Sequence, residues 1–168
     1  VLASVAIGSI GGDMGFSREL SSSEALKMIN PRFTGRANNG TSYVVNAESA
    51  TRRSRASEII DLDLPVFEGQ LGQTARAPKG VYKENSNTLE LAGGVVFLDK
   101  SGNRFDTATA YVDADKDKAV GTGAIQGSGP LGSLRADTYE IQTSTGHVIL
   151  RGHVSGVIRN SEFRDVSP

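Results

Sequence analysis

The stretch LELAGGVVFLDKSGNRFDTATAYVD, residues 89–113, decides the fold class of this chain. Two apolar runs, rich in strand-forming residues, flank the turn signal DKSGN at 99–103. The same unit recurs along the chain. Apolar positions that begin or centre a strand-like run lie 14 or 15 residues apart, at Leu91, Phe105, Val120, Leu134 and Val148. A strand of about 9 residues and a turn of about 5 give this period, so the spacing predicts a β-meander.

Apolar and polar residues alternate within the runs, which predicts strands with one apolar face and one polar face. In EIIDLDLPVF, the residues Ile60, Leu62 and Leu64 share one face, while Asp61 and Asp63 share the other. The run HVILRGHVSGVI, at 147–158, predicts one continuous strand that carries its small and aliphatic residues on a single face. Those residues are Val148, Leu150, Gly152, Val154, Gly156 and Ile158.

Glycines interrupt two of these strands. Gly93 lies inside LELAGGVVF and Gly152 inside ILRGHV. Glycine within a strand is typical of a β-bulge or of a close approach by another backbone.

The first half of the chain contains a hairpin signal and a helix signal. NPRFTGRANNGTSYVVNAESA predicts a hairpin, with Asn39-Gly40 as a two-residue type I′ turn. SSSEALKMI, at 21–29, offers a possible capping box from Ser21 to Glu24 and leaves a short helix open, but such a helix would have barely two turns, which argues against it.

Composition excludes several classes of function. The net charge of −1 argues against a nucleic-acid partner, and the absence of cysteine excludes disulfides and thiolate chemistry. The apolar start VLASVAIGSIGG is too short to span a bilayer, which needs roughly 20 residues. It is either the outer end of a membrane anchor or a glycine-containing leader, and composition does not separate the two.

Two short motifs imitate binding sites. GSGPLG, from Gly127, has the spacing of a dinucleotide loop, but strand-forming residues follow it where a helix is required. DADKDKAVGTGA, from Asp113, resembles a calcium loop but has Lys118 and Ala124 at two essential positions. Both are therefore expected to be turns. We expect no catalytic residue, no metal site and no cofactor.

The order and spacing of several segments resemble one known family. INPRFTGRANNGTSYVVNAESATR, at 29–52, is similar to the N-terminal signature of the LptC family of lipopolysaccharide-export proteins. The similarity continues through 77–113 and ends with GSGPLGSLRADTYEIQTSTGHVILRGHVSGVI, at 127–158. The basic cluster from Arg52 to Arg55 matches no motif of the family.

The resemblance implies an OstA-like β-jellyroll, in which two antiparallel sheets form an open, V-shaped groove. Residues 21–158 would form this domain, after a leader at 1–20 and before a tail at 159–168. The resemblance also implies a periplasmic body held to the inner membrane by an N-terminal transmembrane helix. Lipopolysaccharide would pass from the inner-membrane ABC transporter to the periplasmic protein LptA.

We expect alternating strand faces to line the groove with apolar side chains that contact lipid, at Leu89, Leu91, Val95, Phe97, Phe105, Val148, Leu150 and Val154. Strand addition at open sheet edges would join the domain to its partners, or to a second copy of itself. The resemblance places these edges at 41–48 and 147–158, with Tyr43, Val45, Ala47, Gly152, Gly156 and Ile158 as the edge residues.

Three other functions stay open at this stage. The chain is alternatively an LptA-like bridge protein, which shares the fold. It is alternatively a carbohydrate-binding β-solenoid that uses surface carboxylates such as Asp61, Asp63, Asp113 and Asp115. A structural adaptor that carries no lipid is the third.

Overall fold

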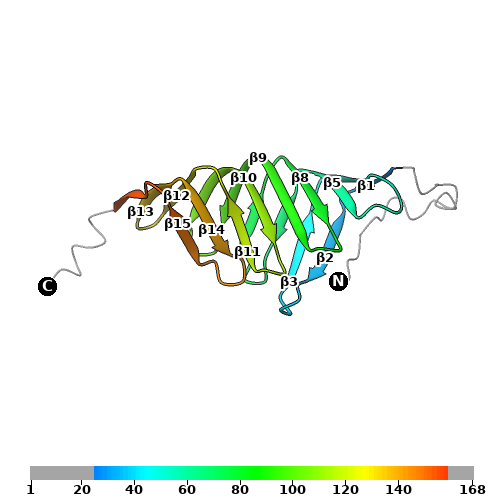
Figure 1. The fold of residues 1–168 in the computed structure, drawn as a ribbon, viewed down its shortest axis with the longest axis horizontal. Coiled ribbons are helices and arrows are strands. Elements are labelled where there is room, and N and C mark those ends of the chain that lie inside the picture. Colours follow the sequence, from blue (N-terminus) through cyan, green and yellow to red (C-terminus); the bar gives the residue numbers. More distant parts are fainter. Residues whose placement is uncertain (1–24, 159–168) are drawn as a thin grey trace.

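A computed structural model describes residues 25–158 of the chain. This part contains sixteen β-strands joined in one open antiparallel sheet, with no helix among them. The chain advances along the long axis of the molecule, so that β1 and β13 lie near opposite ends (Figure 1). The expected leader (1–20) and tail (159–168) lie outside the described residues.

The sheet is folded along a line of bends into two layers. Almost every long strand of the meander is broken near its middle and contributes one part to each layer. The first layer contains β1 (Leu26–Ile29), β4 (Ser49–Arg52), β5 (Ile59–Asp63), β8 (Lys79–Lys83), β11 (Lys118–Gly121), β14 (Thr138–Gln142) and β15 (Val148–Arg151). The second layer contains β2 (Arg32–Arg36), β3 (Ser42–Asn46), β6 (Val66–Glu68), β7 (Thr74–Arg76), β12 (Ile125–Gly129), β13 (Gly132–Ala136) and β16 (Ser155–Ile158).

Two long strands belong to both layers. β9 (Thr88–Leu98) pairs with β8 along its first half and with β7 along its second. β10 (Arg104–Asp113) pairs with β12 and then with β11 in the same way. The register between β9 and β10 shifts where Gly93 and Gly94 lie near Ala108, which confirms the bulge expected at Gly93. Gly93 has a φ of 93°, a conformation that costs a glycine little.

The bends have a common backbone chemistry. Pro31 and Pro65 each follow a bend residue, Pro78 lies in a bend itself, and proline cannot continue a ladder of hydrogen bonds. Asn30 and Leu64 adopt positive φ values of 51° and 52°. Neighbouring bends bond to each other, since the N–H of Leu64 donates to the carbonyl of Pro78 at 2.9 Å. The positive φ turns the side chain of Leu64 outward, so the predicted shared face with Ile60 and Leu62 ends at Leu62.

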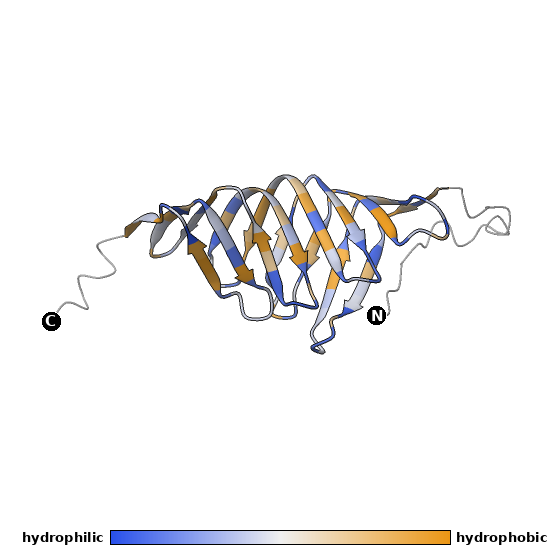
Figure 2. Cartoon of the chain, in the orientation of Figure 1, coloured by the Kyte–Doolittle hydropathy of each residue, from blue (hydrophilic) through white to orange (hydrophobic). Residues whose placement is uncertain are grey.

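Side chains from the two layers meet in the core. The ring centroids of Phe33 and Tyr82 are 5.3 Å apart, and those of Phe97 and Tyr139 are 5.9 Å apart. Orange, apolar strand segments alternate with paler and blue ones along the layers (Figure 2). Twenty-five apolar residues are buried among the described ones, as the alternation predicts.

The short helix that the capping box left open does not form at Leu26–Ile29, which is a strand because its backbone pairs with β4. The β2–β3 hairpin is confirmed, but its register joins Arg36 to Ser42. Only Gly40 has a positive φ, whereas a type I′ turn at Asn39-Gly40 requires both residues to have one.

The predicted β-meander is confirmed, and the two segments that resemble binding motifs are turns, as the sequence analysis predicted. Leu91, Phe105, Val120, Leu134 and Val148 lie in β9, β10, β11, β13 and β15. GSGPLG forms the β12–β13 hairpin, with Gly129 paired to Gly132. The all-β, open jellyroll class is confirmed, since β1, β2, β15 and β16 each pair on one side only.

Candidate functional site

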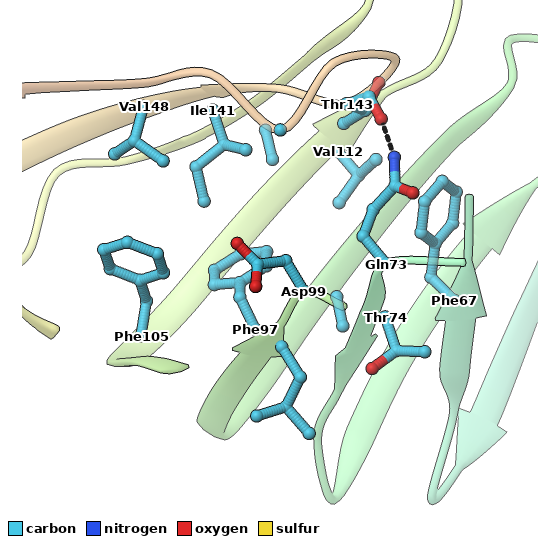
Figure 3. A pocket seen from close by; sticks show the side chains of 14 residues that line it. Phe67, Gln73, Thr74, Phe97, Asp99, Phe105, Val112, Ile141, Thr143 and Val148 are labelled. Atoms are coloured by element: carbon cyan, nitrogen blue, oxygen red, sulfur yellow. Dashed lines mark hydrogen bonds between the residues drawn. The ribbon is translucent and has the colours of Figure 1, made fainter. Parts of the chain in front are cut away.

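An apolar hollow lies between the two layers, toward the C-terminal half of the domain (Figure 3). It contains about 500 Å³ of empty space, part of which is open to solvent. Aromatic rings from the second layer and from the shared strands face aliphatic side chains of the first layer. The main lining residues are Phe67, Phe97, Phe105, Val112, Ile141 and Val148.

Four polar residues stand among these apolar ones. Gln73 precedes β7, Thr74 begins it, Asp99 follows β9, and Thr143 follows β14. Asp99 accepts hydrogen bonds from the backbone N–H groups of Ser101 and Asn103. Burial disfavours ionisation of Asp99, but these bonds and the side-chain bond from Asn103 outweigh it and lower its pKa. Asp99 is therefore an ionised residue that organises its own turn.

Loops of the two layers are tied together across the mouth of the groove. The amide nitrogen of Gln73 donates to the backbone carbonyl of Thr143, as the dashed line in Figure 3 marks. The backbone N–H of Asn38 donates to the carboxylate of Asp115 at 2.8 Å. These bonds cross from second-layer loops to first-layer loops.

A buried series of side-chain hydrogen bonds leads from Asp115 into the core. The hydroxyl of Tyr43 donates to the side-chain carbonyl of Asn87 and lies 3.1 Å from the hydroxyl of Tyr82. The amide nitrogen of Asn87 donates to Asp115 at 3.0 Å. Burial, followed by the bond with Tyr82, raises the pKa of Tyr43 well above its usual range. Burial also raises the pKa of Tyr139, to about 12.

The residues expected to line the groove fall into three groups. Phe97, Phe105 and Val148 line the hollow. Leu89, Leu91 and Val95 are fully buried in the core, and Leu150 is half-buried against it. Val154 is 55 % exposed. Contact with lipid stays a prediction for all of them.

The exposure of Val154 has a backbone cause. The expected continuous strand at 147–158 is two strands, because Gly152 and His153 have φ values of 81° and 45° and form a bend. The period-2 alternation does not continue through a bend of this kind. Val154 therefore does not share the interior face of Val148 and Leu150.

The N-terminal edge also differs from the expectation. β3, which was expected to be an edge, pairs with β2 on one side and β6 on the other. Tyr43, Val45 and Ala47 are consequently buried core residues. Within residues 25–158, the strands on this side that pair along one edge only are β1 and β2.

At the C-terminal end β16 has a free edge within the expected range, and its use as a joint stays a prediction. β16 pairs with β13 alone, and both Gly156 and Ile158 belong to it. Gly152 is not in the strand but in the bend before it, where a Cβ would lie 2.7 Å from a carboxylate oxygen of Asp137. Val157 and Ile158 expose most of their surface.

Asp61 and Asp63, which the carbohydrate-binding alternative would use, form ion pairs within the domain, and so do two arginines of the basic cluster. Arg53 pairs with Asp61 at 2.8 Å, and Asp63 pairs with Lys79. Arg52 pairs with Glu84 at 2.6 Å. No cluster of three metal-ligating side chains occurs within residues 25–158.

Sequence reasoning missed several lining residues. Phe67 lies between the half-buried Val66 and the exposed Glu68 in the short strand β6, so alternation along this strand could have predicted its inward direction. Val112 lies on β10 beyond the bulge, which shifts the phase of the alternation. No sequence pattern predicted that Gln73 lines the hollow, because only the folded structure brings its loop to Thr143.

Comparison with known proteins identifies the family. No helix within residues 25–158 is long and apolar enough to cross a bilayer. A search of curated proteins finds no match. The family model described as "Lipopolysaccharide-assembly, LptC-related" matches residues 14–159. Members of this family take part in lipopolysaccharide transport as periplasmic bridge proteins anchored to the inner membrane. Since the match covers most of the chain, this protein belongs to the LptC family.

Proposed function

We propose that the chain receives lipopolysaccharide from the inner-membrane ABC transporter and passes it to periplasmic LptA. The acyl chains would travel between the two layers, and ATP hydrolysis by the transporter would supply the energy. An N-terminal transmembrane helix would hold the domain at the inner membrane.

One observation carries this proposal. Phe105 lines the central hollow and also a second, shallower hollow beside Leu131, Leu134 and Ile158. Phe105 therefore joins the lining of the interior hollow to that of the second hollow, which reaches β16. A path of this kind suits a lipid in transit, which must be bound without being held by many polar groups.

Partner docking would use the unpaired backbone of the edge strands. β16 offers one free edge and would add to a strand of LptA. At the other end, β1 and β2 are the free edges and would meet the transporter. The same edges would allow two copies of the domain to pair.

A pair of neighbouring substitutions tests the lipid path. Val148→Asp places a charge inside the hollow, whereas Ile149→Asp places the same charge on the outer face of β15. We expect Val148→Asp to abolish transfer of lipopolysaccharide from transporter-containing vesicles to LptA. Ile149→Asp should transfer normally. Equal transfer by the two variants, both folded, would show that acyl chains do not pass this hollow.

A further inference from the structure

The Asn38–Asp115 and Gln73–Thr143 hydrogen bonds cross the mouth of the groove. Each joins a loop of the second layer to a loop of the first. A lipid whose chains lie between the layers keeps its polar headgroup outside the mouth, because burial of polar groups in an apolar interior is costly. A large headgroup therefore cannot move along the mouth while both bonds are closed.

The Gln73–Thr143 bond holds the mouth only weakly. The other amide atom of Gln73, the oxygen Oε1, has essentially no accessible surface and no hydrogen-bond partner, and it faces the ring of Phe67 (Figure 3). The reverse orientation of the amide would bring two acceptors together, so the bond to Thr143 fixes this arrangement. A buried acceptor without a donor destabilises the closed state, and Oε1 regains water when the side chain leaves this position. Opening therefore exchanges one bond within the protein for hydration of both amide atoms.

The mouth has no second bond on the C-terminal side of this one. The loop at 99–103 uses its hydrogen bonds internally, where Asp99 accepts from Ser101 and Asn103. Within residues 25–158, no hydrogen bond joins this loop to the first layer. Asp99 and Gly146 nevertheless both line the hollow, one from each layer. The Gln73–Thr143 bond is therefore the last restraint on the mouth beside the hollow.

The shared strand β9 supplies a hinge between the layers. It passes from one layer to the other through Gly93 and Gly94, whose φ values are 93° and 106°. A Cβ at Gly94 would meet nothing within 4 Å, so neighbouring groups leave room for movement. Glycine changes its backbone angles at little cost, and hinges are often built on a few such residues. Rotation at this bend separates the two edges of the mouth.

Resting on the proposed function, we infer that the Gln73–Thr143 bond opens and closes as each lipid passes, and that the mouth is a gate for the headgroup. The cargo class is an amphiphile whose polar headgroup is too large to enter the groove. Such a cargo fits only the open state and shifts the equilibrium toward it. The Asn38–Asp115 bond opens in the same way, because it is exposed and water replaces it.

A reversible lock on the mouth tests this inference on the full chain, which contains no cysteine. Leu71→Cys and Thr145→Cys place thiols at exposed positions of the two loops that the Gln73–Thr143 bond joins. A cleavable bismaleimide then links the thiols. We expect the locked protein to lose transfer of lipopolysaccharide from transporter-containing vesicles to LptA, and cleavage of the linker to restore it.

The matched control links Leu71→Cys to Lys100→Cys. Both positions belong to loops of the second layer, which meet where the side chain of Lys100 lies over Gly72. This linker does not cross the mouth, so transfer should continue. The locked protein should also bind tetradecanoate as tightly as the control does, because this probe has no large headgroup. Displacement of a fluorescent fatty acid measures that binding.

A second measurement tests the bond itself. Spin labels on the Leu71→Cys and Thr145→Cys thiols report the separation of the two edges of the mouth. Gln73→Met keeps the length of the side chain but removes the donor, and it should increase the fraction of long separations without cargo. Gln70→Met should leave the separations unchanged, because Gln70 lies in the same loop but accepts from the N–H of Ser42 within the second layer.

The outcomes separate the gate from the proposed function. Equal transfer by the locked protein and the control would refute the gate and leave the lipid path standing. Loss of tetradecanoate binding in the locked protein would also refute it, because the lock would then act on the interior and not on the headgroup. Identical separations in Gln73→Met and Gln70→Met would show that the bond does not hold the mouth. If the unlocked protein neither binds tetradecanoate nor transfers lipopolysaccharide, the lipid path itself fails.

Discussion

The backbone N–H of Asn38 donates a 2.8 Å hydrogen bond to the carboxylate of Asp115, across 77 positions of sequence. The same carboxylate oxygen accepts from the side-chain amide of Asn87 at 3.0 Å. One side chain thus ties the β2–β3 loop of the second layer to two loops of the first. The groove is held closed at this point by polar contacts at its mouth as well as by apolar packing behind them.

Removing this carboxylate should loosen the mouth. Asp115→Ala leaves two donors without their acceptor, which costs about 1–3 kcal/mol. Each kcal/mol lowers the Tm of a domain of this size by about 2–4 °C. Lys116→Ala, at the exposed neighbouring position, should leave the Tm unchanged. Indistinguishable melts for the two variants would mean that the contact does not stabilise the closed groove.

The buried tyrosines predict a loss of stability at alkaline pH. Tyr43, Tyr82 and Tyr139 have raised pKa values, mainly because burial disfavours the phenolate. The unfolded chain, with tyrosine pKa values of about 10, releases these protons first. Stability from this source is therefore complete below about pH 10 and declines as the pH rises above it.

Thermal melts from about pH 8 to about pH 11 measure this effect. Tyr139→Phe removes one of the three groups and should flatten the decline relative to wild type. A decline of the same slope in both proteins would assign the alkaline instability to other groups.

The repeating unit of the fold was readable from sequence because strand and turn residues recur at a nearly constant period. The bends were harder to predict. Proline marks three of them, but Asn30, Leu64 and His153 adopt positive φ under tertiary constraint, which local propensity does not encode. Each unrecognised bend changed the phase of the alternation, and this explains the misplacement of Leu64 and Val154. The hollow was only half predictable, since Gln73 and Thr143 meet through a contact 70 positions apart.

Gly132 should control the attachment of β16. Its φ is 144°, and a Cβ at this position would collide with the carbonyl oxygen of Val157. We expect Gly132→Ala to release β16 from β13 while the rest of the domain stays folded. Hydrogen exchange should then accelerate at the amides of 155–158 that bond to β13, and LptA binding should be lost.

The control for this variant is Gly123→Ala, because a Cβ there meets nothing within 4 Å. It should keep both the protection of β16 and the binding of LptA. Protected β16 amides in folded Gly132→Ala would contradict the steric argument.

Proline substitutions along β16 should alternate in effect. Successive residues of a paired edge strand direct their N–H groups alternately toward the neighbouring strand and away from it. Proline at an outward position removes a donor needed only by a partner, so the domain should keep its Tm and lose LptA. Proline at an inward position should detach β16 instead. If every folded variant along 155–158 still captures LptA in a pull-down, β16 is not the joint.

Gly152→Arg, in contrast, should damage the domain itself and not only this edge. Gly152 has a φ of 81°, and a Cβ would lie 2.7 Å from a carboxylate oxygen of Asp137. We expect the substitution to strain the last bend and lower the Tm. Its effect on LptA binding would then follow from damage to the domain.

The most direct test of the lipid path is photo-crosslinking at two positions of one strand. Phe105 lines the hollow, whereas Tyr111, also on β10, is exposed. With a photoreactive residue at each position and an ATP-driven transporter present, the account predicts that lipopolysaccharide crosslinks at 105 and not at 111. Equal yields at the two positions, or no crosslink at 105 in a folded domain with a working transporter, would contradict it.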